Sequence, residues 1–334
     1  MKAQVLHKYD DDLTAPSWVD YIDVPDPVIT KGSDVIVRIG GAGVCRTDLH
    51  VIEGIWRPHM DPNGNELLPL ILGHENAGWV DDVGPEVEGL KKGDPVIIHP
   101  KISNGTCIAC RRGQDMHGEG TFPGLDSDGG YAEALVTSER NIIKLPKSLL
   151  PKEVAPYSDA GLTAYRAAKK ATRHLLPGEY CVVIGAGGLG HIAIQVLRAM
   201  CAAEIIVVDT SDTSLALAGE CGADHLVKAD GGEVDAILSL TKGHGAEAVL
   251  RKEGHQEAEA HEYHHVHVLV RAVVPRHAVR GVEHGAGVRV GARRLLAVLR
   301  ADHMKVIDAE TVNGTKVRID LHRAEGGHRG SIEL

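Results

Sequence analysis

Short apolar runs separated by clusters of Gly, Pro and Asp dominate residues 1–155. Three of these runs are DVIVRIGGAGV (34–44), NAGWVDDVG (76–84) and GDPVIIHP (93–100). Runs of this length, rich in Val and Ile and bounded by turn-forming residues, are typical of β-strands. We therefore expect residues 1–155 to form a compact, barrel-like β domain.

The pattern changes from residue 156 onward. Apolar residues recur at three-to-four spacing in APYSDAGLTAYRAAKKATRHLL (155–176), which predicts a helix. A strand, a glycine-rich turn and an amphipathic helix follow in YCVVIGAGGLGHIAIQVLRAM (180–200), and strands and helices alternate up to about residue 250. Such alternation indicates a parallel sheet with helices on its faces. The expected fold class is therefore α/β, with a doubly wound domain over residues 156–291.

Length and charge add broad limits. A chain of 334 residues is too long for one typical core, which agrees with two domains. The formal charge of −10 disfavours nucleic acid and anionic membranes as partners. No run of about 18 apolar residues occurs, and the first residues lack a signal-peptide core, so we expect no membrane span and a cytoplasmic location. Under that expectation the six cysteines are metal ligands or buried small residues, not disulfides.

The glycine-rich turn follows the pattern G-x-G-x-x-G with Gly185, Gly187 and Gly190, and it encloses Gly188 and Leu189. A strand precedes it and a helix follows it. The first glycine permits the tight turn, the second lets the backbone approach a pyrophosphate, and the third allows the helix to pack closely on the strand. This context predicts a dinucleotide site, whereas a glycine turn without a nucleotide is the alternative.

Asp209 ends the next strand, about 20 residues after the glycine turn. A carboxylate at this position can accept hydrogen bonds from an adenosine ribose and repels a 2′-phosphate. The sequence therefore predicts NAD rather than NADP as the cofactor.

Three further turns carry candidate metal ligands. GVCRTDLH (43–50) contains Cys45, LGHENAG (72–78) contains His74, and SDAGLT (158–163) contains Asp159. One thiolate, one imidazole and one carboxylate with an open fourth position describe a catalytic zinc site. Their separations are too long for spacing alone to join them, and a single Cys or His is more often a core or surface residue.

Four segments, in the order in which they occur, resemble the medium-chain zinc alcohol dehydrogenases: GVCRTDLH, LGHENAG, SDAGLTAY and VVIGAGGLG. The likeness covers residues 1 to about 250. The resemblance implies a GroES-like β-barrel catalytic domain, a Rossmann domain, and a return of residues 292–334 to the catalytic domain. It also implies that Cys45, His74 and Asp159 bind one catalytic zinc ion. Aspartate as the third ligand is typical of a bacterial subset that acts on secondary and aryl alcohols.

The resemblance assigns roles to the neighbouring residues as well. Zinc lowers the pKa of a bound alcohol. Thr47 then takes the alcohol proton, and His50 receives it through the nicotinamide ribose. A surface imidazole without a role is the alternative for His50. Asp48 is expected to bond the far nitrogen of His74, and Glu75 is either an outer partner of the zinc site or an alternative ligand.

Many relatives hold a second, structural zinc ion on four closely spaced cysteines. The corresponding stretch, NGTCIACRRGQDMHG (104–118), keeps Cys107 and Cys110 but has Asn104 and Gly118 at the outer positions. A closed structural site needs four strong ligands. We therefore predict that this lobe has lost its zinc, and that the cofactors are one catalytic zinc ion and NAD. Weak binding by the two thiolates with a neighbouring His or Asp is the alternative.

Residues 251–290 are atypical of the family. They are rich in His and Arg and nearly free of aromatic residues, where relatives continue with apolar strands and glycine turns. This composition resembles codons read in a shifted frame of a GC-rich gene, which is our first hypothesis, and a His-rich metal-binding segment is the second interpretation.

The expected function is transfer of hydride between NAD and a primary, secondary or aryl alcohol, with the aldehyde or ketone in the reverse direction. The resemblance further implies a homodimer or homotetramer. Three alternatives remain: a polyol or sugar dehydrogenase of the same superfamily, a zinc-free quinone or enone reductase, and an NAD-binding protein without catalysis.

Overall fold

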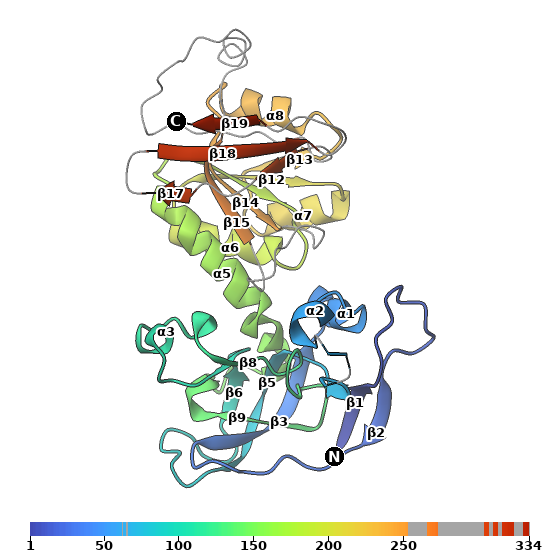
Figure 1. Cartoon of the computed structure of the whole chain (residues 1–334). Coiled ribbons are helices and arrows are strands. Elements are labelled where there is room, and N and C mark those ends of the chain that lie inside the picture. Colours follow the sequence, from blue (N-terminus) through green and yellow to red (C-terminus); the bar gives the residue numbers. More distant parts are fainter. Residues whose placement is uncertain are drawn as a thin grey trace. The chain divides into compact units, whose positions relative to one another are not determined.

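The computed structural model describes residues 1–252 except Pro62 and Asn65, together with the backbone of five later strands. The chain divides into two compact units, Met1–Leu162 and Thr163–Leu334 (Figure 1). The domain limits expected from the sequence, after residues 155 and 291, stay predictions. Of the segment 251–290 that the sequence marks as atypical, residues 253–265 and 273–290 lie outside the described residues.

The first unit is built on antiparallel sheets. A five-stranded sheet has the order β10-β6-β5-β3-β9, and a three-stranded sheet has the order β2-β1-β4. Two short strands, β7 and β8, form a separate pair. The bounds are β1 Lys2–Leu6, β2 Asp20–Asp23, β3 Asp34–Gly43, β4 Leu70–Ile71, β5 Glu75–Val83, β6 Pro95–Ile98, β7 Ile102–Ser103, β8 Gly120–Thr121, β9 Ala134–Ser138 and β10 Ile142–Lys144.

The pairing of β3 with β5 is what positions the candidate site. Alternate residues of these strands face a core, in which Val35, Val37 and Val80 are buried with residues of β6 and β9. A shift of one residue would turn these valines to the opposite face, so the burial fixes the register. In that register the last residue of β3, Gly43, lies opposite the first residue of β5, Glu75. The turns that follow β3 and precede β5 are therefore neighbours.

Short helices connect the strands of the first unit. They are α1 Arg46–Ile52, α2 Arg57–Met60, α3 Ile108–Arg111 and α4 Pro151–Val154, with 3-10 turns η1 Asp115–His117, η2 Glu139–Asn141 and η3 Ala155–Ser158. Helix α5, Ala160–Ala171, begins in this unit and is followed by η4, Thr172–His174. The backbone of α4 passes so close to β3 that a Cβ at Gly41 would lie 2.6 Å from the Cα of Lys152. Glycine is required at that crossing because no side chain fits between the two backbones.

The second unit holds a five-stranded sheet in the order β13-β12-β11-β14-β15. The first four strands pair in parallel, and β15 is antiparallel to β14. The bounds are β11 Tyr180–Ile184, β12 Glu204–Asp209, β13 His225–Lys228, β14 Ala246–Lys252 and β15 Val266–Ala272, with helices α6 Gly190–Met200, α7 Asp212–Glu220 and α8 Glu233–Leu240. The chain order reverses between β11 and β14, which is the position where open α/β sheets bind ligands at the carboxyl ends of their strands.

Four strands end the chain: β16 Met304–Val306, β17 Glu310–Val312, β18 Lys316–Arg323 and β19 Gly330–Glu333. Strand β18 pairs antiparallel with each of the other three. The expected return of residues 292–334 to the first domain stays a prediction. The expected α/β class, with an antiparallel β domain and a parallel sheet, is confirmed.

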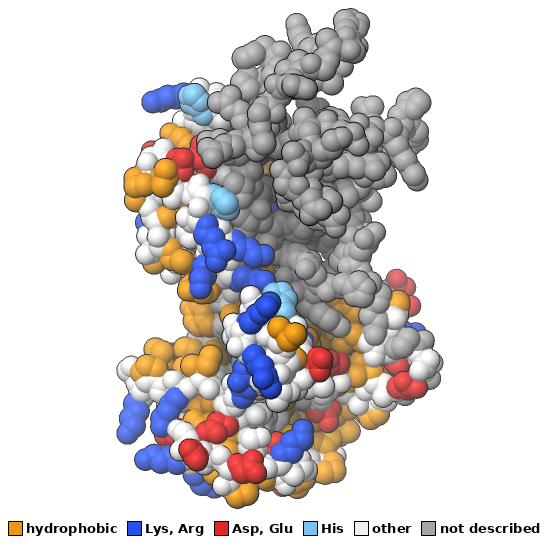
Figure 2. Space-filling view, turned by 60° about the vertical axis from the view of Figure 1, so that its left-hand side comes forward, with side chains coloured by type: hydrophobic (Ala, Val, Ile, Leu, Met, Phe, Trp, Pro, Cys, Tyr) orange, Lys and Arg blue, Asp and Glu red, His pale blue; other side chains and the backbone are white. Residues whose placement is uncertain are grey.

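The described surface carries charges of both signs. On the face shown in Figure 2, lysine and arginine side chains lie among acidic and hydrophobic ones. Within the described part of the chain, every helix is too short or too polar to cross a membrane. The predicted absence of nucleic acid and membrane partners rests on the net charge and stays a prediction.

Candidate metal centre and nucleotide loop

Four side chains from distant parts of the sequence converge in the first unit. A thiol sulfur of Cys45, an imidazole nitrogen of His74 and carboxylate oxygens of Glu75 and Asp159 all lie within 4.8 Å of one another. His74, Glu75 and Asp159 are buried, and Cys45 is half-buried. The structure thus brings together the three predicted zinc ligands, and it adds Glu75 to the same cluster.

The fold explains this convergence. Cys45 lies just after β3 and His74 lies just before β5, so the Gly43–Glu75 pairing places the two turns side by side. The carboxylate of Glu75 then accepts a hydrogen bond of 3.0 Å from the backbone N–H of Ala160, the first residue of α5. A carboxylate is favoured at a helix N-terminus because the first N–H groups are unpaired within the helix. This bond holds the start of α5, and with it Asp159, against the start of β5.

Asp48 fixes the orientation of the His74 ring. Its Oδ1 lies 3.1 Å from His74 Nδ1, and the opposite ring nitrogen, Nε2, lies 3.6 Å from Asp159 Oδ2. The other oxygen of Asp48, Oδ2, accepts a hydrogen bond of 2.8 Å from the backbone N–H of Cys45. A carboxylate that holds one ring nitrogen sets the tautomer and leaves the other nitrogen to bind a metal. The contact expected between Asp48 and His74 is therefore present.

The acid–base properties of the cluster favour a cation at its centre. Burial by itself lowers the pKa of His74, but hydrogen bonds to Asp159, Asp48 and Cys45 outweigh it and raise the pKa well above the ordinary value. Burial by itself raises the pKa of Cys45, yet hydrogen bonds from His74 and Thr47 bring that pKa below its usual value. The cluster thus stabilises a thiolate and a positive charge together.

Glu75 differs from the other members of the cluster. Burial, the main cause, raises the pKa of its carboxyl to about 7, and the nearby carboxylates of Asp159 and Asp48 act in the same direction. A divalent cation reverses such shifts because it stabilises every anion around it. The donor set of one sulfur, one imidazole and carboxylate oxygens fits a catalytic zinc ion, with three protein ligands and one open position.

The two residues expected to move the proton lie beside the cluster. Thr47 is buried, and its hydroxyl lies 3.6 Å from the Cys45 sulfur. His50 is only 5 % exposed, which excludes the surface imidazole considered as its alternative. Its Nε2 accepts a hydrogen bond of 3.2 Å from Arg46, so a neutral His50 ring carries its proton on Nδ1. The ring of Trp56 packs edge-on against His50, with 5.8 Å between the centroids.

Tyr131 is a residue that the sequence reasoning missed. Its hydroxyl lies 2.9 Å from Asp48 Oδ2 and 3.0 Å from the carbonyl oxygen of Gly43, and it donates its one proton to either acceptor. Its ring lies under Gly73, where an added Cβ would lie 2.5 Å from Tyr131 Cδ1, and its backbone N–H donates to Leu72. Burial and the Asp48 carboxylate raise the pKa of Tyr131, so the hydroxyl stays protonated. Tyr131 lies far from these residues in sequence, and no spacing rule would have indicated it.

We expect the variant Tyr131→Phe to bind zinc about 10- to 100-fold more weakly than the unmodified chain, the usual effect of removing an outer partner of a metal site. The ring and its packing under Gly73 remain, but Asp48 loses a donor that holds it against His74. Competition with a chromogenic chelator measures the change. Tyr9→Phe is a matched control, because it removes a hydroxyl bonded to a buried carboxylate, Asp61, that is not a member of the Cys45–His74–Glu75–Asp159 cluster. Equal zinc affinity in both variants would contradict this role of Tyr131.

The glycine-rich turn in the second unit adopts the geometry expected of a nucleotide loop. Gly185 follows β11 with a φ of +89°, a conformation that favours glycine. A Cβ at Gly190, the first residue of α6, would lie 1.9 Å from the carbonyl oxygen of Gly185. Around Gly187 and Gly188 the space is open, since a Cβ there would meet nothing within 4 Å. Leu189 completes the loop as the residue before α6.

Asp209 lies beside this loop at the end of β12. Its Oδ2 accepts a hydrogen bond of 2.7 Å from the backbone N–H of Ala186, and its Oδ1 accepts one of 2.7 Å from Ser211. The carboxylate therefore joins the first turn of the sheet to the second. An ionised carboxylate has about four acceptor sites, so it can also bind a ribose hydroxyl. The loop and the start of α6 lie at the switch point of the sheet with the Asp209 carboxylate beside them, an arrangement that fits the pyrophosphate and the ribose of a dinucleotide.

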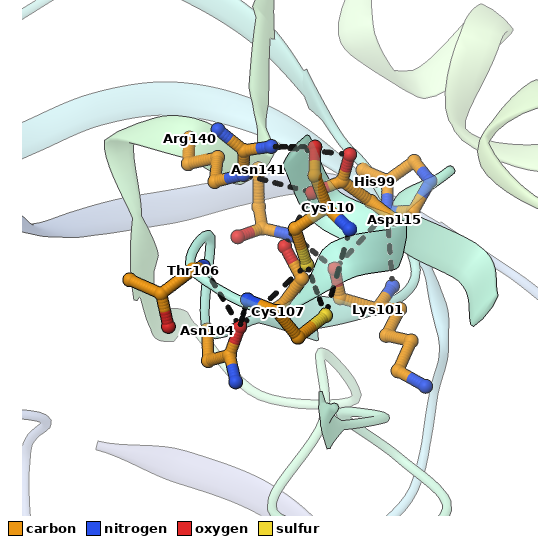
Figure 3. A network of polar contacts seen from close by, with 10 residues as sticks. His99, Lys101, Asn104, Thr106, Cys107, Cys110, Asp115, Arg140 and Asn141 are labelled. Carbon is orange, nitrogen blue, oxygen red and sulfur yellow. Dashed lines mark hydrogen bonds and ion pairs between the residues drawn. The ribbon is translucent and has the colours of Figure 1, made fainter. Parts of the chain in front are cut away.

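The lobe that corresponds to the structural zinc site contains a close pair of thiols. Cys107 Sγ and Cys110 Sγ are 3.2 Å apart (Figure 3). A Cβ at Gly118 would lie 2.5 Å from Cys110 Sγ, so this position faces the pair but contributes no donor. The Asn104 amide oxygen instead accepts backbone N–H bonds from Thr106 and Cys107. The expected loss of zinc from this lobe stays a prediction.

Comparison with known proteins agrees with the geometry. A family model described as "Alcohol dehydrogenase GroES-like domain" matches residues 31–147, and one described as "Zinc-binding dehydrogenase" matches residues 188–267. A relative named NAD-dependent alcohol dehydrogenase, from Sulfolobus acidocaldarius, is 37% identical over 294 residues, which cover 87% of this chain and 81% of the relative. A relative named D-arabinose 1-dehydrogenase (NADP(+)), from Saccharolobus solfataricus, is 37% identical over 77% of this chain and 70% of its own.

Solved structures give the same result. The alcohol dehydrogenase from the hyperthermophilic archaeon Aeropyrum pernix is 48% identical, with a TM-score of 0.68 over 75% of this chain and 71% of that one. A β domain with a zinc-type cluster and a second domain with a nucleotide loop define the class of zinc-binding dehydrogenases. More narrowly, the chain belongs to the zinc-type medium-chain alcohol dehydrogenases. The family and the enzyme class expected from the sequence are confirmed, while the aspartate-ligand subset stays a prediction.

Proposed function

We propose that this chain catalyses the reversible NAD-dependent oxidation of primary, secondary or aryl alcohols, with one zinc ion held by Cys45, His74 and Asp159. The observation that carries the proposal is the buried cluster in which donor atoms of these residues and of Glu75 lie within 4.8 Å of one another. Relatives named NAD-dependent alcohol dehydrogenase, 37 to 38% identical to this chain, support the same reaction.

The chain's own residues supply the proton path. Zinc bound in the cluster supplies Lewis acidity, which lowers the pKa of the substrate hydroxyl. Thr47, beside the Cys45 sulfur, accepts the hydroxyl proton and can pass on its own. His50 is the proposed next acceptor. Its Nε2 faces Arg46, whose side chain is 54% exposed, so the ring lies one residue away from solvent. NAD at the glycine loop provides the hydride acceptor.

Glu75 has two possible roles in this proposal. Its hydrogen bond to Ala160 makes it a support for the Asp159 turn, and its distance to the other donors allows it to act as a fourth ligand in the absence of substrate. The supporting role accounts for both its contact and its burial, and we propose it as the main one. Cys45, His74 and Asp159 would then hold the zinc ion, and the substrate hydroxyl would complete its set of ligands.

We expect Asp209→Asn to shift the preference for NADP over NAD by at least about tenfold, a ratio that corresponds to about 1.4 kcal/mol. The substitution keeps the size of the side chain and one acceptor oxygen, so one of the two backbone N–H groups, of Ala186 or of Ser211, loses its partner. It also removes the charge that repels a 2′-phosphate. The ratio of kcat/KM for the two cofactors measures the change. Asp212→Asn, which removes an exposed carboxylate three residues further on, is the control. An unchanged ratio for Asp209→Asn would remove the basis for NAD selectivity.

A sugar or polyol is the second substrate class. It is favoured by the relative named D-arabinose 1-dehydrogenase (NADP(+)) and by a solved galactitol-1-phosphate dehydrogenase from Escherichia coli, which is 28% identical with a TM-score of 0.60 over 72% of this chain and 65% of that one. The zinc-free reductase, in contrast, has no use for a buried thiolate–imidazole–carboxylate cluster.

The test combines zinc content with NADH formation on primary, secondary and benzylic alcohols and on pentoses and polyols. The proposal expects about one zinc ion per chain and turnover of at least one alcohol class. Turnover with zinc well below one per chain supports the zinc-free reductase, turnover of sugars alone supports the second class, and NAD binding without turnover supports a non-catalytic protein. A homodimer or homotetramer is the proposed assembly, and light scattering coupled to size-exclusion chromatography tests it.

A further inference from the structure

The pair of cysteines in the lobe between β7 and β8 takes no part in the proposed reaction. Their sulfur atoms are 3.2 Å apart, and both come from one turn that precedes and enters α3 (Figure 3). A disulfide has an S–S length of about 2.05 Å, so the two sulfurs need to approach by only about 1.1 Å to bond. No other cysteine of the chain contributes to this lobe, because the remaining four lie outside residues 102–121.

We propose that Cys107 and Cys110 are a thiol–disulfide exchange site, at which the lobe forms a reversible disulfide by reaction with low-molecular-weight aliphatic disulfides. The close pair of sulfurs carries the proposal. It is independent of the proposed alcohol oxidation and of the zinc cluster.

The two thiols are unequal in a way that sets the order of reaction. Cys107 is half-buried and accessible, whereas Cys110 is only 2% exposed. The backbone N–H of Cys110 lies 3.5 Å from Cys107 Sγ, and hydrogen bonding from this N–H is the main cause that lowers the pKa of Cys107. An accessible thiol with increased thiolate character attacks first, and a buried neighbour resolves the product.

The exchange balances without any group beyond the external disulfide. The Cys107 thiolate attacks one sulfur of RSSR, breaks the S–S bond and releases RS⁻, which takes up a proton. Cys110 then loses its proton and attacks Cys107 Sγ in the mixed disulfide, which releases a second RS⁻. Two protein thiols are oxidised to one disulfide, and RSSR is reduced to two RSH.

Contacts with the Asn104 and Arg140 side chains hold the pair in place. Asn104 accepts the backbone N–H of Cys107 at 3.0 Å, and Arg140 donates both to the carbonyl of Cys110 at 3.1 Å and to the carboxylate of Asp115 at 2.8 Å. These bonds anchor both cysteines of the turn (Figure 3). Gly118 lies next to the sulfurs, where an added Cβ would lie 3.2 Å from Cys107 Sγ. Because this residue is a glycine, no side chain covers the sulfurs from that position. The pair is therefore held in place, and the half-buried Cys107 sulfur is the one that a small disulfide can reach.

The full-length, zinc-loaded chain is incubated with hydroxyethyl disulfide, alkylated and digested with trypsin, which leaves both cysteines in the peptide of residues 102–111. We expect this peptide to become two hydrogens lighter and unreactive to the alkylating reagent, and dithiothreitol to restore both thiols. Cys110→Ser should trap a mixed disulfide on Cys107, and Cys107→Ser should leave Cys110 unmodified. Cys221, a half-buried thiol of the second unit, is the internal control for disulfide exchange and alkylation at a cysteine outside this lobe.

Three results overturn the proposal. One is a stable mixed disulfide on Cys107 in the unmodified chain, which shows that Cys110 does not resolve it. Another is full alkylation of both thiols after treatment with the disulfide. The third is resistance of both thiols to alkylation that is lost only when a chelator is added, which would assign the thiols to a metal ion instead.

Discussion

Cys45→Ser and Asp159→Ala are each expected to lower zinc affinity by more than about 100-fold, beyond the range found for outer partners of metal sites, and to abolish measurable alcohol oxidation with it. The cluster is buried, so each change leaves the remaining donors without a replacement from solvent. Serine in place of Cys45 keeps nearly the same shape, but its hydroxyl does not ionise near neutral pH as the thiol does. Zinc per chain after dialysis and the rate of NADH formation measure the two effects.

Matched variants separate ligand loss from a general effect. Cys201→Ser removes a half-buried thiol of the second unit whose sulfur contacts the Leu197 carbonyl, and it should retain zinc and activity. Glu75→Gln keeps an acceptor for the Ala160 N–H and removes the charge. Retained zinc in this variant would therefore agree with a role of Glu75 in holding the Asp159 turn and not in binding the metal. Zinc and full activity in both Cys45→Ser and Asp159→Ala would show that the metal assignment is wrong.

The apolar pattern predicted more of the fold than of the site. Val–Ile runs between turn residues are sufficient to predict the antiparallel strands, and the strand–turn–helix of residues 180–200 is sufficient to predict a nucleotide loop, because both signals are local. The contact between Cys45 and His74 is not local. It depends on the register that places Gly43 opposite Glu75, and this register is set by burial of valines that the sequence alone cannot pair.

The remaining site residues show the same limit. The prediction of Asp159 as a ligand rests on resemblance alone. The contact that places Asp159 in the site is the hydrogen bond from the Ala160 N–H to Glu75, which joins residues 85 positions apart. The sequence contains no pattern that predicts the role of Tyr131, because a Tyr after two glycines does not indicate a hydrogen bond to Asp48. His50 was expected near the surface or in a proton path, and only the packed structure shows it buried against Trp56.

The second large effect is expected in the nucleotide loop. Alanine substitutions at two glycines of this one motif should impair the protein for different reasons. Gly190→Ala places a Cβ 1.9 Å from the carbonyl oxygen of Gly185. A backbone atom cannot move aside cheaply, and Gly185 is itself bonded to the Val208 carbonyl through its N–H at 2.8 Å. We expect a loss of stability of about 1–3 kcal/mol or more, as for an overpacked core, together with a loss of NAD binding.

Gly187→Ala should behave in the opposite way in the absence of cofactor. Its added Cβ meets nothing within 4 Å, and its φ lies outside the left-handed range, so the melting temperature should match that of the unmodified chain. The same methyl group occupies the space through which a pyrophosphate approaches the backbone, so NAD affinity should fall by about tenfold or more. Thermal unfolding without cofactor and calorimetric titration with NAD measure the two quantities. Unchanged NAD affinity in Gly187→Ala would place the pyrophosphate elsewhere, and wild-type stability in Gly190→Ala would mean that the helix and strand do not approach as closely as this loop requires.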